Sequence, residues 1–132
     1  MADKVLGRWA LIPELSIYQQ GSAPLSGVYE IARRKEQFEF RVRWTPVDGG
    51  AQEIAFAGSA SGEKTDVGGG LAMAVVVVSD SILDTTAYLG DRRVGYARRA
   101  ASEDGALLSV MQEAFADDGA AIRNFQVYRR MA

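Results

Sequence analysis

The 132-residue sequence contains no cysteine and no histidine. Without cysteine the chain cannot form disulfides, use a thiolate nucleophile, or bind zinc or iron–sulfur clusters through sulfur. Without histidine it cannot hold a Ser-His-Asp triad, an imidazole-bound zinc ion or a histidine-ligated haem. We therefore expect no metal and no cofactor, and we expect any catalysis to depend on carboxylate, tyrosine or arginine side chains.

The sequence also lacks an excess of positive charge and a long apolar run. Its formal net charge is −2, whereas nucleic-acid-binding domains usually carry a basic excess. The longest apolar stretch, Leu71 to Val78, is far shorter than the roughly 20 residues that a membrane-spanning helix needs. The first five residues lack the apolar segment of a signal peptide. We expect a cytoplasmic protein that neither binds nucleic acid nor spans a membrane.

Proline is scarce, with 3 residues, but 14 glycines separate runs that are rich in β-branched and aromatic side chains. Such even spacing is typical of a sandwich or a barrel. The predicted strands lie within residues 5–12, 28–34, 37–45, 52–60, 71–79, 81–89, 92–101 and 121–130. We predict that residues 1–132 form a single all-β domain. We expect an up-and-down antiparallel barrel of about 8–10 strands with at most one short helix.

The run at 37–45 shows the clearest alternation of apolar and polar residues. Its apolar residues, Phe38, Phe40, Val42 and Trp44, are expected to point into the barrel. The valines from Val75 to Val78 predict a strand that is buried, or nearly buried, on both of its faces. Residues 13–21 are consistent with a short helix or an irregular lid. Residues 106–118 fit either a strand or a helix, and we favour a strand because a meander needs a partner for its last strand.

Both ends of the chain resemble one known group of proteins. Gly7-Arg8-Trp9 is similar to the Gly-x-Trp opening shared by lipocalins, fatty-acid-binding proteins and avidins, together called calycins. In those families the tryptophan closes one end of the barrel beneath an arginine of the last strand. The resemblance implies that Trp9 lies beneath Arg129 or Arg130, and we assign this role to Arg129. The overall likeness is to small bacterial lipocalin-like proteins of undefined function.

The last strand also bears on the ligand. Gln126 and Tyr128 match the Arg-x-Tyr pair with which fatty-acid-binding proteins hold a carboxylate. Because glutamine carries no charge, a buried carboxylate would lack its partner. A neutral or hydroxylated apolar ligand therefore fits better. If Gln126 and Tyr128 face inward, they are polar anchors in an apolar cavity. If Phe125 and Val127 face inward instead, the polar residues form the wet outer surface.

Strand 92–101 offers a second polar pair. An inward Tyr96 and Arg98 could bind a carboxylate and replace the charge missing at Gln126. The alternative is a solvated basic edge with Tyr96 covering the core. The expected ligand-binding residues are thus Tyr96, Arg98, Gln126, Tyr128, Phe40 and Trp44.

Three functions are compatible with these patterns. The leading hypothesis is a non-enzymatic carrier that holds a small apolar or hydroxylated ligand inside the barrel. A second is a small barrel enzyme, of the isomerase or cyclase type, that uses Tyr96, Arg98, Asp84 or Glu113. The third is a structural barrel without a ligand. Such a protein could form a homodimer through an exposed face of its sheet.

Overall fold

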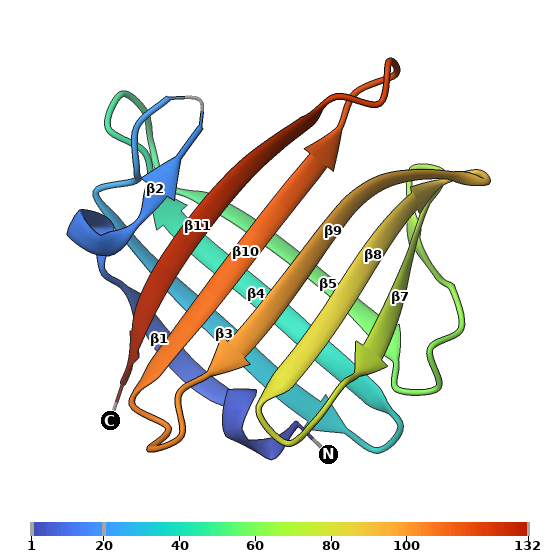
Figure 1. Ribbon diagram of the computed structural model, residues 1–132, viewed down its shortest axis with the longest axis horizontal. Helices are drawn as coiled ribbons and strands as arrows, with labels where there is room; N and C mark the ends of the chain where they lie inside the picture. The colour runs from blue at the N-terminus through green and yellow to red at the C-terminus, as the bar shows by residue number, and fades with distance from the viewer. Residues whose placement is uncertain (1, 20, 132) are drawn as a thin grey trace.

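The computed structural model describes residues 2–19 and 21–131 and confirms the predicted all-β barrel (Figure 1). The strands are β1 (Gly7–Leu11), β2 (Ile17–Tyr18), β3 (Ser26–Arg34), β4 (Gln37–Thr45), β5 (Gln52–Ser59), β6 (Thr65–Gly68), β7 (Leu71–Val77), β8 (Ile82–Leu89), β9 (Arg92–Ala101), β10 (Leu107–Phe115) and β11 (Ala121–Arg130). Two 3-10 turns, η1 (Asp3–Val5) and η2 (Pro13–Leu15), are the helical elements of the described residues.

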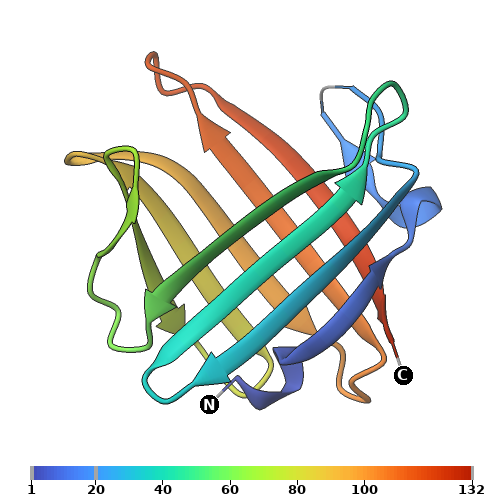
Figure 2. The ribbon, with the colours of Figure 1, turned by 180° about the vertical axis from the view of Figure 1, so that it is seen from behind.

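The strands form one antiparallel sheet that curls into a near-closed barrel. Its order is β5-β4-β3-β1-β11-β10-β9-β8-β7-β6, and β2 adds to the edge of β11. Strand β1 lies between β3 and β11 and pairs with both, so it connects the N-terminal and C-terminal halves of the sheet. Figure 2 shows β3, β4 and β5 crossing in front of the β8–β11 half of the barrel.

A seam without a strand-to-strand ladder separates β5 from β6 and β7. Side chains close it. A Cβ atom at Gly58 would lie 2.4 Å from Cγ2 of Val75, so the lack of a side chain lets β5 approach β7. Near this contact the Ser59 amide donates a hydrogen bond to Thr65 Oγ1 at 3.2 Å. The seam is therefore packed along part of its length.

The Gly-x-Trp motif closes one end of the barrel. Trp9 is fully buried, and its indole N–H donates to the Val5 carbonyl at 3.0 Å. The guanidinium of Arg130 lies 4.2 Å from the centre of the Trp9 ring. Our assignment of Arg129 to this position is wrong. Side chains alternate along a strand, so Arg130 shares the inner side with Trp9, its partner in the ladder, and exposed Arg129 points outward.

The two ambiguous segments now have defined structures. Residues 107–115 form strand β10, whose inward Leu108 and Val110 are fully buried, so the helical alternative is wrong. In segment 13–21 a 3-10 turn precedes β2, where Tyr18 pairs with Asn124; residue 20 lies outside the described residues. Strand β6 was not predicted, because four residues ending in glycine carry little periodicity.

The valine run is not buried on both faces. Val75 faces the core and is fully buried, whereas Val76 and Val78 are 48% and 47% exposed. The prediction failed because β7 belongs to a single-layered barrel, in which one side of each strand meets solvent. Among the described residues, no helix has the length and apolarity that crossing a membrane would require.

Candidate functional site: two lobes inside the barrel

The barrel interior contains two adjoining lobes that share the lining residues Tyr29, Val42, Ile54, Gln112 and Asn124. The first lobe has a volume of about 300 Å³ and the second about 330 Å³. The first is also lined by Leu11, Tyr18, Pro24, Gly27, Trp44, Gln126 and Tyr128. The second is also lined by Phe56, Met73, Thr85, Ala87, Gly95, Tyr96, Ala97, Arg99, Glu113, Ala114 and Ile122. Both volumes lie at the lower end of the range of small-molecule sites.

The size of inward-facing side chains decides where the barrel is hollow. Near Trp9 the interior is filled by large buried residues, among them Phe38, Leu83 and Leu108. Around the second lobe the inward positions carry Ala87, Gly95, Ala97 and Ala114. Ile54 pairs with the inward Val42 and yet is 52% exposed. The interior therefore opens to solvent on the side of the β4–β5 and β10–β11 turns, away from the chain ends (Figure 1).

A chain of hydrogen bonds forms one wall of the first lobe. The buried Tyr128 hydroxyl donates to Gln126 Oε1 at 2.9 Å, and Gln126 Nε2 donates to Gln112 Oε1 at 2.7 Å. Gln126 also hydrogen bonds to the Tyr18 hydroxyl. Burial raises the pKa of both tyrosines, so both hydroxyls keep their protons at neutral pH. Gln126 and Tyr128 therefore face inward, which is the first of the two alternatives left open by the sequence.

Arg99 is the charged group inside the barrel. Its side chain is only 2% exposed and borders the second lobe. Its Nε donates to the Tyr29 hydroxyl at 2.7 Å and its Nη1 donates to Thr85 Oγ1 at 2.9 Å. Its guanidinium also lies 4.7 Å from the centre of the Phe40 ring. Each of these partners is neutral, and no carboxylate among residues 2–19 and 21–131 forms an ion pair with Arg99.

The neighbouring Arg98 points out of the barrel. Its Nε and Nη2 both donate to the Asp84 carboxylate at 2.8 Å, and the Tyr96 hydroxyl donates to the same carboxylate at 2.8 Å. Burial tends to raise the pKa of Asp84, but these hydrogen bonds outweigh burial and lower it. Arg99 also lowers it across the sheet, but Arg98 and Tyr96 already occupy both Asp84 oxygens. Asp84 therefore leaves Arg99 without a direct partner.

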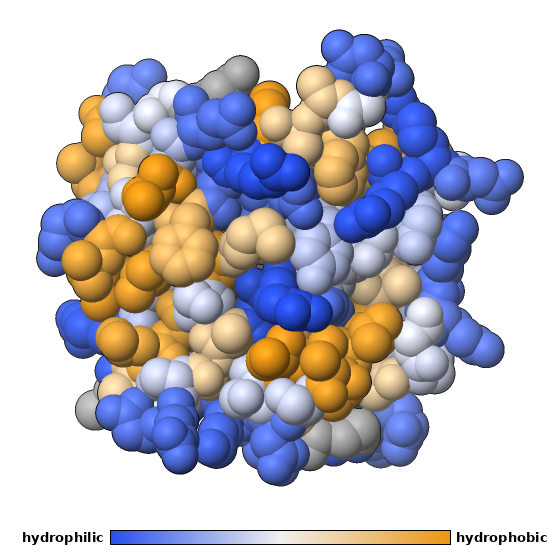
Figure 3. Space-filling model, viewed as in Figure 1, coloured by the Kyte–Doolittle hydropathy of each residue, from blue (hydrophilic) through white to orange (hydrophobic). Residues whose placement is uncertain are grey.

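The outer face of β8–β11 carries the ion pairs of Asp84 and Glu113. In Figure 3 strongly hydrophilic atoms lie near its centre between apolar patches. Glu113 borders the second lobe along its strand, but its carboxylate forms an ion pair with the exposed Arg123 at 2.8 Å. Asp84 and Glu113, the carboxylates that the enzyme hypothesis requires, are thus both engaged by outward arginines. No cluster of three or more potential metal ligands occurs among the described residues.

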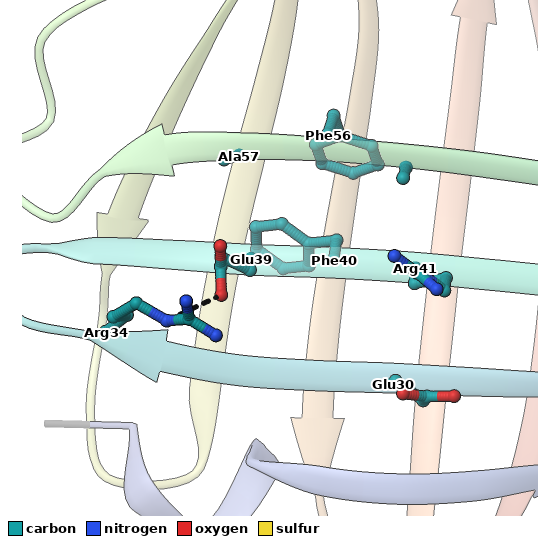
Figure 4. A pocket seen from close by; sticks show the side chains of 8 residues that line it. Glu30, Arg34, Glu39, Phe40, Arg41, Phe56 and Ala57 are labelled. Carbon is teal, nitrogen blue, oxygen red and sulfur yellow. Dashed lines mark ion pairs between the residues drawn. The ribbon is translucent and has the colours of Figure 1, made fainter.

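A larger hollow of about 550 Å³ lies on the outer face of β3, β4 and β5 (Figure 4). Charged side chains surround it, including the ion pair between Arg34 and Glu39 at 3.4 Å. The Arg34 side chain is 78% exposed, so this pair is screened by water and weak. Phe40 and Phe56 belong to the same strands but stack on each other with ring centres 4.7 Å apart. We place the candidate site inside the barrel because this hollow is lined largely by charged, solvated side chains.

The structure brings together some of the predicted site residues. Trp44, Gln126 and Tyr128 line the first lobe. Phe40 lies in the buried core beside Arg99, and Tyr96 borders the second lobe while its hydroxyl bonds to Asp84. Arg98 does not reach the interior. We did not predict five of the lining residues from the sequence: Arg99, Gln112, Tyr18, Tyr29 and Thr85. Arg99 could have been found, because it alternates with small residues at Gly95 and Ala97.

The meander, the tryptophan closure and the interior lobes define a calycin, or lipocalin-like, fold. Two solved structures are similar to it at low sequence identity. The siderocalin Ex-FABP, which functions through dual ligand specificities, has a TM-score of 0.54 and 10% identity over 97% of this chain and 74% of its own. The fatty-acid-binding protein of Manduca sexta has a TM-score of 0.53 and 14% identity over 94% of this chain and 98% of its own. No protein-family model and no curated protein matches the sequence.

Proposed function

We propose that the protein is a non-enzymatic carrier that holds a small, largely apolar ligand in the two lobes, with an acidic head group of the ligand against Arg99. The solved structures with a similar fold are named for ligand binding, which supports a carrier role. The observation that carries the proposal is the buried Arg99 guanidinium with no carboxylate partner beside a cavity.

A buried charge without a counter-ion is costly, because the interior cannot replace its hydration. The Tyr29 and Thr85 hydroxyls and the Phe40 ring offset part of this cost. An anionic oxygen in the second lobe would complete the compensation and could accept a charge-assisted hydrogen bond from the guanidinium. This argument replaces our expectation of a neutral ligand. That expectation assumed that Gln126 leaves the interior without a fixed charge.

The apolar remainder of the ligand would occupy the rest of the cavity. Leu11, Val42, Trp44 and Ile54 line the first lobe. Burial of an alkyl chain against such side chains contributes about 0.8 kcal/mol per methylene group. The carrier hypothesis thus explains both the apolar lining and the buried Arg99 guanidinium. The enzyme hypothesis is weaker, because Asp84 and Glu113 are engaged by outward arginines.

The test compares dodecanoate with dodecanol, which share a chain and differ in the head group. We expect the protein to bind dodecanoate at least about tenfold more tightly, a difference of about 1.4 kcal/mol. Isothermal titration or displacement of a fluorescent apolar probe measures both affinities. Arg99→Met should remove the preference, since methionine keeps much of the side-chain volume without the charge.

Arg98→Met provides the matched control, because it removes the same residue type one position away on the outer face. We expect it to keep the preference for dodecanoate. Equal affinities of the two ligands for the unmodified protein would refute the role of Arg99. If neither ligand binds, the carrier proposal itself is refuted.

A further inference from the structure

The junction of the two lobes carries polar groups that Arg99 does not explain. Gln112 and Asn124 line both lobes, whereas Arg99 borders only the second. A ligand that reaches from Arg99 into the first lobe must therefore pass these two amides. Their free hydrogen-bonding atoms decide what the middle of such a ligand can contain.

The orientation of Asn124 is set by a backbone group. The Gln19 backbone N–H is shared between the Arg123 carbonyl at 3.2 Å and Asn124 Oδ1 at 3.3 Å. A backbone N–H can only donate, so the oxygen of the Asn124 amide must face it. The NH₂ group of Asn124 is left over, and no described residue accepts a hydrogen bond from it. Asn124 thus has hydrogen-bond donors available toward the cavity that it lines.

The orientation of Gln112 follows from its neighbour. Gln126 accepts from Tyr128 through its oxygen and uses its NH₂ group toward Gln112 and Tyr18. Gln112 Oε1 accepts this bond, so the NH₂ group of Gln112 remains without an acceptor among the described residues. No buried side-chain nitrogen or oxygen of the described residues lacks a partner. Both free NH₂ groups are therefore accessible to solvent, and both residues line the cavity.

We infer that the junction of the two lobes is a hydrogen-bond-donating subsite, in which Asn124 and Gln112 hold an acceptor oxygen in the middle of the ligand. A ketone, ester or ether oxygen has this chemistry. The inference rests on the proposed function and extends it: the ligand carries an acidic head at Arg99, an acceptor oxygen along its chain, and an apolar tail in the first lobe. A ligand with a plain alkyl chain leaves both amides without partners.

The experiment uses dodecanoates that carry one ketone at successive carbons, each compared with plain dodecanoate by calorimetry. For at least one ketone position we expect the affinity to rise about fivefold, as one net hydrogen bond predicts. Positions on either side should show a smaller gain or none. If plain dodecanoate binds and no ketone position improves binding, the subsite is refuted while the carrier function stands. If plain dodecanoate does not bind, the carrier function fails, and with it this inference.

Two variants test the residues. Asn124→Asp and Gln112→Glu each exchange an NH₂ group for an oxygen and keep the acceptor that contacts Gln19 or Gln126. We expect each to lose the ketone gain, taken as the affinity ratio of the ketone to plain dodecanoate within one variant. The ratio cancels the effect of the added negative charge on the head group. A ketone gain that persists in both variants would overturn the assignment.

Gln19→Glu is the matched control, because it makes the same exchange at an exposed residue whose Oε1 accepts from the Arg123 amide at 2.7 Å. It adds a negative charge close to Asn124 but outside the cavity, and it should keep the ketone gain. Gln112→Met removes the donor without adding charge, so it serves if a carboxylate at the junction prevents folding. It should lose the ketone gain while plain dodecanoate still binds.

Discussion

The closure of the barrel beneath Arg130 yields a quantitative prediction about stability. The Arg130 guanidinium donates to the carbonyls of Gly105 at 2.7 Å, Leu6 at 2.9 Å and Lys4 at 2.8 Å, and it covers the Trp9 ring. It therefore ties the N-terminal segment and the β9–β10 turn to the last strand. Three hydrogen bonds at about 0.5–1.5 kcal/mol each and a cation–π contact of about 0.5–1 kcal/mol give roughly 2–4 kcal/mol, once solvent exposure is allowed for.

The perturbation is Arg130→Met, which keeps an apolar stem over Trp9 and removes every donor. We expect the free energy of unfolding to fall by about 2–4 kcal/mol, which lowers the melting temperature by roughly 10 °C in a chain of this size. Urea unfolding followed by tryptophan fluorescence measures the loss. Arg130→Lys should be intermediate, because an ammonium keeps the charge but cannot span three carbonyls in one plane.

Arg129→Met is the control, since Arg129 is exposed on the opposite side of the same strand. We expect its effect to stay within about 0.5 kcal/mol, as for most surface substitutions. An equal loss in both variants would show that the effect is not specific to the closure. A loss below about 0.5 kcal/mol for Arg130→Met would refute the view that this arginine holds the barrel end together.

Two further predictions concern the seam and the outer face. Gly58→Ala should lower the free energy of unfolding by about 1–3 kcal/mol, because the new Cβ would lie 2.4 Å from Val75 Cγ2 in a packed seam. Urea unfolding measures this loss. An unchanged unfolding midpoint would contradict the close packing of β5 on β7. The pKa of Asp84 is lower in the folded protein than its usual value, so its contribution to stability is fully present above about pH 4 and is lost as the pH falls further. The stability difference between the unmodified protein and Asp84→Asn should therefore shrink in acid, and a difference independent of pH from 7 to about 2 would contradict the ion pair with Arg98.

Most of the fold could be predicted from local patterns. The alternation in residues 37–45 identified the inward set correctly, because one side of each strand of a single-layered barrel is buried and the other is wet. The Gly-x-Trp motif located the closed end. Its arginine was misassigned between two adjacent residues, since the sequence alone does not say at which residue the last strand enters the ladder with β1. A shift of one residue changes the face of every side chain.

The same ambiguity concerns Arg99, the buried cation on which our proposal rests. Because side chains alternate along a strand, one of the adjacent arginines 98 and 99 must face inward. We expected Arg98 to do so, since it shares a face with Tyr96. The small residues Gly95 and Ala97 decide the matter in the structure, because they line the hollow with Arg99. A cavity inside a barrel requires small inward side chains. The alternate positions that carry small residues therefore indicate the lining face of a strand better than the positions that carry aromatic residues.

Our proposal of an acidic head group departs from the expectation of a neutral ligand for a related reason. It treated the glutamine at position 126 as the loss of charge from the interior, although the ladder brings other strands to the same level. Val110 on β10 pairs with Gln126 on one side and with Arg99 on the other. Arg99 and Gln126 therefore lie in one row across β9, β10 and β11, and both face the interior. Arg99 on β9 therefore supplies a positive charge two strands away from position 126 on β11, where the Arg-x-Tyr pair would place it. In a barrel, the polarity of a ligand site depends on the inward residues that lie at the same level on neighbouring strands. Only the register of the strands shows which residues these are.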